Sequence, residues 1–209
     1  MDFKRLNLIV GWFTFLIATV VYLVSVEPTT SFWDCGEFIA TAYKLEVGHP
    51  PGAPFFMLVA RVISMFVPVD QAALLVNSIS ALCSAFTVLF LFWTITLFAK
   101  KIALKDGELT KDKMIAILGS GLVGGLAYTF SDTAWFSAAE GEVYSMSSLF
   151  TAVCFYAMLK WETVADESHS KKWIIVIAYF IGLSIGVHLL SLLTIPAITF
   201  IYYFNCKVS

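Results

Sequence analysis

Hydrophobic side chains fill five long runs of this chain, and short polar segments separate the runs. A run of about 20 apolar residues can cross the ~30 Å hydrocarbon core of a bilayer as one helix. Each of the first four runs therefore predicts one membrane span. These four runs cover residues 6–26, 71–99, 114–131 and 143–159.

The fifth run, residues 173–206, is too long for one span. As a single helix it would be roughly 50 Å long, because a helix rises about 1.5 Å per residue. It contains His188 but no lysine, arginine, aspartate or glutamate, and Pro196 follows a little further on. We expect the run to break near these two residues into two spans, which gives about six transmembrane helices in an all-α polytopic membrane protein.

Composition supports a membrane protein over a soluble one. Hydrophobic residues make up 59% of the chain and charged residues 13%, whereas a soluble domain carries about 25% charge. The four cysteines lie far apart and form no CxxC pair or Cys/His cluster. We therefore expect no disulfide framework, no metal and no other cofactor, and no nucleic-acid partner.

The lysines and arginines predict the orientation of the spans. Basic residues collect on the cytoplasmic side of membrane proteins, and with six spans all but Lys44 and Arg61 of the 13 basic residues fall on one side. Both ends of the chain are then cytoplasmic, and the segment 27–69 faces the periplasm of a bacterial inner membrane. The residues placed inside are Lys4, Arg5, Lys100, Lys101, Lys105, Lys111, Lys113, Lys160, Lys171, Lys172 and Lys207.

The outer segment 27–69 predicts two short interfacial helices. Residues 33–47 form an amphipathic pattern, with N-cap candidates at 29–31, and residues 55–66 form a second, apolar pattern that is too short to span. The intervening residues 48–54 contain three prolines and cannot be helical. We expect helix, rigid turn and helix along the outer surface.

Asp34, Glu37 and His49 are the first candidates for chemistry in that segment. Asp34 and Glu37 are three residues apart and share one helical face. Asp34 either caps the helix or acts as a general base that takes a proton from an acceptor hydroxyl. Glu37 either binds substrate hydroxyls or is a solvated helix residue. His49, held between glycine and two prolines, either contacts a phosphate or bonds to backbone.

Four further residues are candidates for substrate binding. Arg61 either reaches toward lipid headgroups or neutralises a lipid phosphate. Glu140 and Glu142 border a predicted span, where acids are costly unless used or hydrated, so we expect one of them to share a chamber with Asp34. His188 interrupts the longest apolar run and is either functional or bonded between helices.

Two motifs, residues 29–38 and 48–54, carry a resemblance to a known family. Their arrangement after a first span resembles the N-terminal module of GT-C glycosyltransferases. More closely, the motifs resemble a bacterial membrane family, described as a domain of unknown function, that is related to the protein O-mannosyltransferase transmembrane protein 260. The resemblance extends to residues 139–144 and 186–188, and so covers nearly the whole chain.

This resemblance implies an activity and its partners. The donor would be a polyprenyl-phosphate sugar, with mannose as the sugar, and the acceptor a protein Ser or Thr hydroxyl on the outer face. Transfer would invert the anomeric centre, with Asp34 as the base and Glu37 as its partner. Residues 1–209 would form a single transmembrane module, the N-terminal part of a longer protein, in contact with membrane lipid.

Two other classes of function compete with this prediction. A transporter or lipid flippase would also use acids in a membrane protein for substrate or proton binding. Against it, the acids gather at the predicted outer boundary and not at the midplane, and the sequence shows no inverted repeat. A membrane scaffold without catalysis is the third possibility, and it predicts that Asp34 is replaceable.

Overall fold

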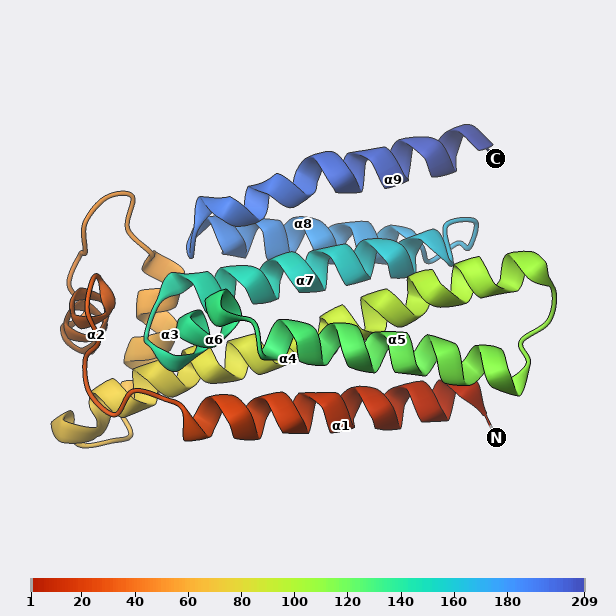
Figure 1. The fold of residues 1–209 in the computed structure, drawn as a ribbon. Coiled ribbons are helices and arrows are strands. Elements are labelled where there is room, and N and C mark those ends of the chain that lie inside the picture. The colour runs from red at the N-terminus through yellow and green to blue at the C-terminus, as the bar shows by residue number, and fades with distance from the viewer. Residues whose placement is uncertain (1, 209) are drawn as a thin grey trace.

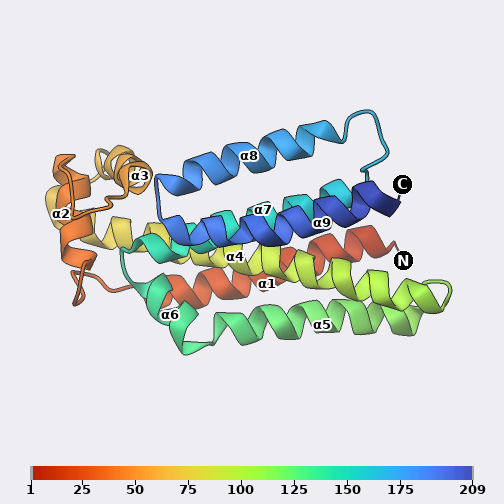
Figure 2. The ribbon, with the colours of Figure 1, turned by 90° about the horizontal axis from the view of Figure 1, so that it is seen from above.

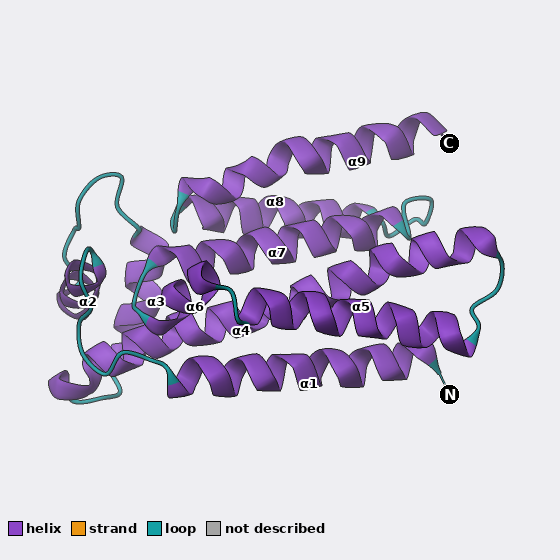
Figure 3. Ribbon diagram, in the orientation of Figure 1, coloured by secondary structure: helices purple, strands orange, loops and turns teal. Residues whose placement is uncertain are grey.

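A computed structural model describes residues 2–208 of the chain. The side chains of Asp106 and of residues 206–208 lie outside the described part. The prediction that Lys207 lies on the cytoplasmic side therefore also falls outside it. Helices and loops account for all the described residues, which include no strand (Figure 3). The predicted all-α class is therefore confirmed.

Six long helices run side by side along one axis, and consecutive ones point in opposite directions (Figures 1 and 2). Both ends of the described chain lie at one end of this bundle, opposite the outer segment 27–69 (Figure 1). The long helices are α1 (Phe3–Val24), α4 (Ala72–Ala103), α5 (Lys111–Thr129), α7 (Val143–Glu162), α8 (Lys171–Ile185) and α9 (Thr194–Val208).

Three of these helices are long and apolar enough to cross a membrane, fewer than the six spans predicted. They are α1, the continuous stretch Val69–Ala103 that ends in α4, and α7. A fourth is counted if α5 and the short helix α6 (Asp132–Ala139), bent by 61°, form one broken span. Helices α8 and α9 have 15 residues each, about 22 Å of rise, which is short of the ~30 Å core.

The fifth apolar run breaks where the sequence predicted. Helix α8 ends before Gly186, the 3-10 helix η3 (Leu189–Leu193) follows His188, and α9 begins at Thr194. Pro196 lies in the first turn of α9, where its missing N–H leaves no intrahelical bond unmade. The break is thus made of Gly186 and the turn around His188, while the proline lies in the first turn of the next helix.

Helix α4 forms the centre of the bundle and packs against α1, α5, α6 and α7. Its buried residues lie on all sides, as expected for a helix enclosed by others. Two glycines of α5 allow close approach: a Cβ on Gly121 would lie 2.6 Å from Thr96 Cγ2, and one on Gly125 would lie 3.1 Å from Thr14 Cγ2. The glycine spacing therefore serves packing within the bundle.

The outer segment contains two helices whose limits differ from those predicted. Helix α2 (Cys35–Lys44) begins later and ends earlier than 33–47, because Trp33 and Leu45 are both left-handed, with φ of 67° and 56°. The N-cap position is Asp34, whose side chain makes no capping bond, so the predicted caps at 29–31 are wrong. Helix α3 (Pro54–Ser64) begins on a proline, a favoured first position.

A buried amide on α4 fastens the start of the outer segment. Asn77 is fully buried, and its Nδ2 donates to the carbonyl oxygens of Glu27 at 2.7 Å and Thr29 at 2.8 Å. Its Oδ1 accepts a weak bond from the Cys35 thiol at 3.6 Å. One side chain thus positions the residues that lead into Asp34.

Replacing Asn77 with aspartate is expected to loosen this segment. The substitution keeps the size but removes both donors and sets a carboxylate against two carbonyl oxygens. We expect a loss of about 2–3 kcal/mol in the free energy of unfolding, measured as a lower thermal midpoint in detergent, and faster proteolysis within residues 27–53. Ser78→Ala on the same helix removes only a bond to the Leu74 carbonyl and should change neither. Equal behaviour of the two variants would contradict the fastening role.

Candidate functional site

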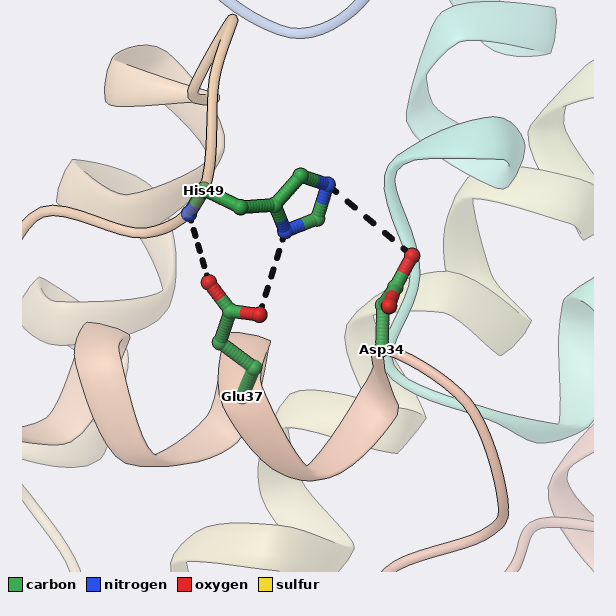
Figure 4. A group of neighbouring side chains, drawn as sticks. All are labelled: Asp34, Glu37 and His49. Atoms are coloured by element: carbon green, nitrogen blue, oxygen red, sulfur yellow. Dashed lines mark hydrogen bonds and ion pairs between the residues drawn. The ribbon is translucent and has the colours of Figure 1, made fainter.

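Asp34, Glu37 and His49 meet at the end of the bundle that carries the outer segment (Figure 4). The backbone N–H of His49 donates to Glu37 Oε1 at 2.6 Å, and its Nδ1 lies 3.1 Å from Glu37 Oε2. On the other side of the ring, Nε2 lies 4.0 Å from Asp34 Oδ2. The imidazole therefore lies between two carboxylates that are three residues apart at the start of α2, Asp34 at the N-cap position and Glu37 in the first turn.

Glycine at position 48 allows this arrangement. A Cβ there would lie 2.9 Å from Glu37 Oε1, so a larger residue would push the carboxylate away from the next N–H. The chain then turns: Gly52, with φ of 75°, donates its N–H to the His49 carbonyl at 2.9 Å. His49 is thus held by its backbone as well as by its ring.

The pairing shifts both partners toward their charged forms. The backbone N–H of His49, followed by its ring, lowers the pKa of Glu37. The hydrogen bond to Glu37, then the charge of Glu37 and that of Asp34, raise the pKa of His49. His49 therefore keeps a positive charge to higher pH than an isolated histidine, next to Asp34.

Asp34 also lines a cavity of about 520 Å³, here called the acidic cavity. Its walls come from the outer segment, from α4 to α7, and from η3. Both Glu140 and Glu142 line it, at 4% and 7% exposure, so three carboxylates face one space. The lining residues are Trp33, Asp34, Ser84, Tyr128, Ser131, Thr133, Ala134, Phe136, Ser137, Glu140, Glu142, Tyr144, Ser145, Ser148 and Leu190.

The two glutamates differ in their surroundings. Glu140 accepts a hydrogen bond from the Ser31 hydroxyl, which links it to the outer segment. Burial, with smaller contributions from the charges of Glu140 and Asp34, raises the pKa of Glu142 from 4.5 to about 7. Near neutral pH Glu142 therefore holds a proton part of the time and can donate a hydrogen bond into the cavity.

Glu142 is expected to make stability depend on pH. Unfolded, its carboxyl ionises near 4.5, whereas in the folded protein it keeps its proton up to about pH 7. The folded state binds more protons in this interval, so the free energy of unfolding falls as the pH rises from about 4.5 to about 7. We expect the decrease in the free energy of unfolding over this interval to be about 1–3 kcal/mol smaller in Glu142→Gln than in the wild type. The measurement is the thermal midpoint of each protein at several pH values between about 4.5 and 7.

The control for this prediction is Glu46→Gln. Glu46 is an exposed acid on the same outer segment, and its replacement should leave the pH dependence of the wild type in place. Parallel curves for wild type and Glu142→Gln would contradict the raised pKa.

His188 lies next to the acidic cavity, and Arg61 does not. A small pocket of about 70 Å³ is lined by Asp34, His49, Glu142 and His188 among others. The Nδ1 of His188 accepts the Leu190 N–H at 3.1 Å, which leaves Nε2 available. Arg61 instead donates to the Tyr43 carbonyl on α2, and its guanidinium carbon lies 5.4 Å from the centre of the Tyr43 ring. The phosphate role predicted for Arg61 stays a prediction.

A second cavity, about 610 Å³ in volume, adjoins the acidic cavity. Tyr128, Ser148 and Leu190 line both, so they mark the junction. The walls of the second space are mostly apolar, and we call it the apolar cavity. Its lining residues are Thr87, Leu91, Thr94, Tyr128, Ser147, Ser148, Thr151, Ala152, Phe155, Leu190, Leu193, Thr194 and Ala197.

Sequence reasoning did not find these junction residues. They come from α5, α7 and η3 and lie within apolar runs, so no local pattern separates them from ordinary helix-packing residues. Trp33 was predicted as the first residue of the helix 33–47, whereas it is left-handed in the structure and lines the acidic cavity.

Ligand atoms of Asp34, Glu37 and His49 lie within 4.8 Å of one another, close enough to be bridged by a divalent cation. The Nδ1 of His49 is already paired with Glu37, however. The absence of a metal requirement therefore stays a prediction.

Residues 34–209 match the family described as the protein O-mannosyl-transferase TMEM260 N-terminal domain. The chain belongs to this family. The match begins at Asp34 and includes every candidate site residue, and the family resemblance predicted from the motifs is confirmed. The apolar helices and the membership in the TMEM260 family together support a membrane protein.

Two curated TMEM260 proteins illustrate the relation. The chain is 26% identical over 144 residues to protein O-mannosyl-transferase tmem260 of Dictyostelium discoideum, covering 68% of this chain and 16% of that protein. It is 26% identical over 171 residues to TMEM260 of Mus musculus, covering 82% of this chain and 22% of that protein. The chain therefore spans only a fifth or so of these relatives. No solved structure matches it.

Proposed function

We propose that this chain is the membrane module of a protein O-mannosyltransferase that uses a polyprenyl-phosphate sugar as donor. Its TMEM260 relatives are named as protein O-mannosyl-transferases. The observation that carries the proposal is the acidic cavity beside Asp34 and its junction with the apolar cavity.

The two cavities fit the two parts of such a donor. A sugar offers hydroxyl groups to carboxylates, and Glu140 and Glu142 are buried in the wall of the acidic cavity. The polyprenyl chain needs apolar surface, and the apolar cavity supplies it between α4, α7 and α9. The phosphate would lie between them, near the small pocket that His49 and His188 line.

In this proposal Asp34 acts as the base. Its side chain is 55% exposed, so an acceptor protein can reach it from outside, whereas Glu140 and Glu142 are enclosed. Asp34 takes the proton of a Ser or Thr hydroxyl while the oxygen attacks the anomeric carbon. The bond from that carbon to the phosphate oxygen breaks, polyprenyl phosphate leaves, and the anomeric centre is inverted.

Glu37 and His49 have supporting parts in this scheme. Positive charge on His49 stabilises the departing phosphate, as hydrogen-bond donors aimed at developing charge do. Glu37 holds His49 through its backbone N–H and its ring Nδ1, and it raises the pKa of the imidazole. Glu37 is therefore a positioning residue, and Glu140 and Glu142 bind sugar hydroxyls. A monophosphate leaving group held in this way requires no metal.

The arrangement of charges suits a site on the periplasmic face of a bacterial inner membrane, with both termini cytoplasmic. The first turn of α1, which contains Lys4 and Arg5, lies at one end of the bundle with the lysine-bearing α4–α5 and α7–α8 connections, and the outer segment lies at the other end (Figure 1). Trp33 and Asp34 of the outer segment line the acidic cavity. The positive-inside rule then places the cavity outside. Six crossings would require a bilayer thinned around the short helices α8 and α9.

The test is a donor comparison with purified full-length protein. We expect transfer of a hexose to acceptor Ser or Thr from mannosyl polyprenyl phosphate and none from GDP-mannose, read by mass spectrometry of the acceptor. Transfer should persist in EDTA. Movement of the lipid-linked sugar across vesicles without modification of any acceptor would contradict the proposal and favour a flippase.

A further inference from the structure

A separate pocket of about 360 Å³ is lined by residues from the end of the bundle that holds the termini (Figure 1), and it shares no lining residue with the acidic cavity. It is formed by the first turns of α1 and the last turns of α4 and α7. Each helix contributes one lysine: Lys4, Lys100 and Lys160. No aspartate or glutamate is among the residues that line it. We call it the basic pocket.

The positive charge of this pocket is not balanced by carboxylates. Lys100 Nζ lies 5.0 Å from the centre of the Phe3 ring, and Lys160 Nζ lies 5.8 Å from that of Tyr156. Within the described part of the chain, none of the three lysines forms an ion pair with an acid. The nearby Glu162 pairs with Lys101 instead. Three lysines therefore line one pocket without forming an ion pair to a carboxylate in the described part of the chain.

Helix dipoles explain the positions of only two of these three lysines. Lysines in the last turn of a helix are favoured by the negative end of the dipole, and Lys100 and Lys160 are in such turns. Lys4 lies in the first turn of α1, where a cation is disfavoured. An anion bound among the three would offset that repulsion.

The rest of the pocket points to a lipid and not to a soluble anion. Leu8, Trp93 and Leu97 form an apolar wall. Leu8 and Trp12 are 51% and 45% exposed, so the apolar face of α1 continues away from the lysines along the bundle. A phosphate bound at the lysines would thus have its acyl chains beside this face.

Asn7 adds a second polar feature. It lines the basic pocket, and its Oδ1 is buried with no hydrogen-bond partner in the described part of the chain. A buried unpaired acceptor is costly, and a hydroxyl group on a bound ligand would satisfy it.

We propose that the basic pocket binds the headgroup of an anionic phospholipid that also carries hydroxyl groups, a phosphatidylglycerol-type lipid. The lysines bind the phosphate diester, Asn7 accepts from a glycerol hydroxyl, and the acyl chains run along α1. Basic pockets between transmembrane helices bind acidic lipid headgroups in this manner. The proposal is independent of the sugar-transfer activity.

The test is native mass spectrometry of the full-length protein titrated with phosphatidylglycerol and, separately, phosphatidylcholine. We expect one phosphatidylglycerol to bind preferentially. Joint replacement of Lys4, Lys100 and Lys160 by glutamine should raise its Kd by roughly 100-fold. The matched control replaces Lys105, Lys171 and Lys172, three exposed lysines at the same end, and should change the Kd less than about threefold.

Two further arms test the parts of the headgroup. Asn7→Leu should raise the Kd for phosphatidylglycerol by roughly tenfold. It should leave the Kd for phosphatidylmethanol unchanged, because that lipid has the same charge but no headgroup hydroxyl. Inorganic phosphate at millimolar concentration should not displace the lipid.

Three results would overturn the proposal. Equal losses in both triple variants would indicate diffuse attraction to the basic end. Displacement by inorganic phosphate would indicate a site for soluble phosphate. Binding of phosphatidylcholine as tight as that of phosphatidylglycerol would remove the role of charge.

Discussion

Asp34→Asn in the full-length protein is expected to lower kcat for sugar transfer by about 100- to 10,000-fold. The amide keeps the size of the side chain but cannot take the acceptor proton. The side chain makes no capping bond in α2, so folding should be unaffected. The measurement is hexose transfer from mannosyl polyprenyl phosphate, alongside the thermal midpoint in detergent.

A matched control separates this effect from a general loss of charge. Asp70 is an exposed acid of the 3-10 helix η1 (Val69–Gln71), and it lies outside the acidic cavity. Asp70→Asn should keep full activity. A wild-type rate of transfer in Asp34→Asn would contradict the general-base role of Asp34 but would not affect the assignment to the TMEM260 family.

Ser148→Trp is expected to close the junction between the two cavities. Ser148 lines both spaces and is only partly buried, so an indole there occupies the path from sugar to lipid chain. We expect kcat/KM for the lipid-linked donor to fall by roughly 10- to 100-fold, equivalent to about 1.4–2.8 kcal/mol of donor binding. Ser148→Ala, which leaves the junction open, should be close to wild type.

The pattern of inhibition provides a second measurement. Free polyprenyl phosphate should inhibit the wild type and Ser148→Ala but only weakly inhibit Ser148→Trp. If Ser148→Trp is folded and binds the lipid as tightly as the wild type, the polyprenyl chain does not pass through this junction.

The apolar runs of the sequence predicted most of the helices of the fold. They located α1, α4, α5 and α7, and the interruption at His188 located the break between α8 and α9. The number of crossings was harder to predict. A run of uncharged residues sets the longest possible helix, whereas turns at Gly186 and η3 shorten the helices that form. The helix α6 was not predicted, because residues 132–139 lie between the apolar runs 114–131 and 143–159 and are too few to form a span.

The candidate site was predictable where its residues are close in sequence. The motifs around Asp34 and His49 pointed to a cluster, and spacing on a helix brought Asp34 and Glu37 together. The left-handed backbone of Trp33 and the walls shared by Tyr128, Ser148 and Leu190 depend on contacts between distant helices. A local sequence pattern does not predict such contacts. It also does not predict the burial that raises the pKa of Glu142.

Asn77 has a consequence for the mechanics of the cavity. A Cβ on Gly141 would lie 2.7 Å from Asn77 Oδ1, so the chain between Glu140 and Glu142 rests on the same turn of α4 that holds residues 27–29. Asn77 therefore positions both the segment that leads into Asp34 and the segment 140–142, although more than a hundred residues separate these segments in sequence. A tilt of α4 would therefore move Asp34 and Glu142 together and preserve the distance between them.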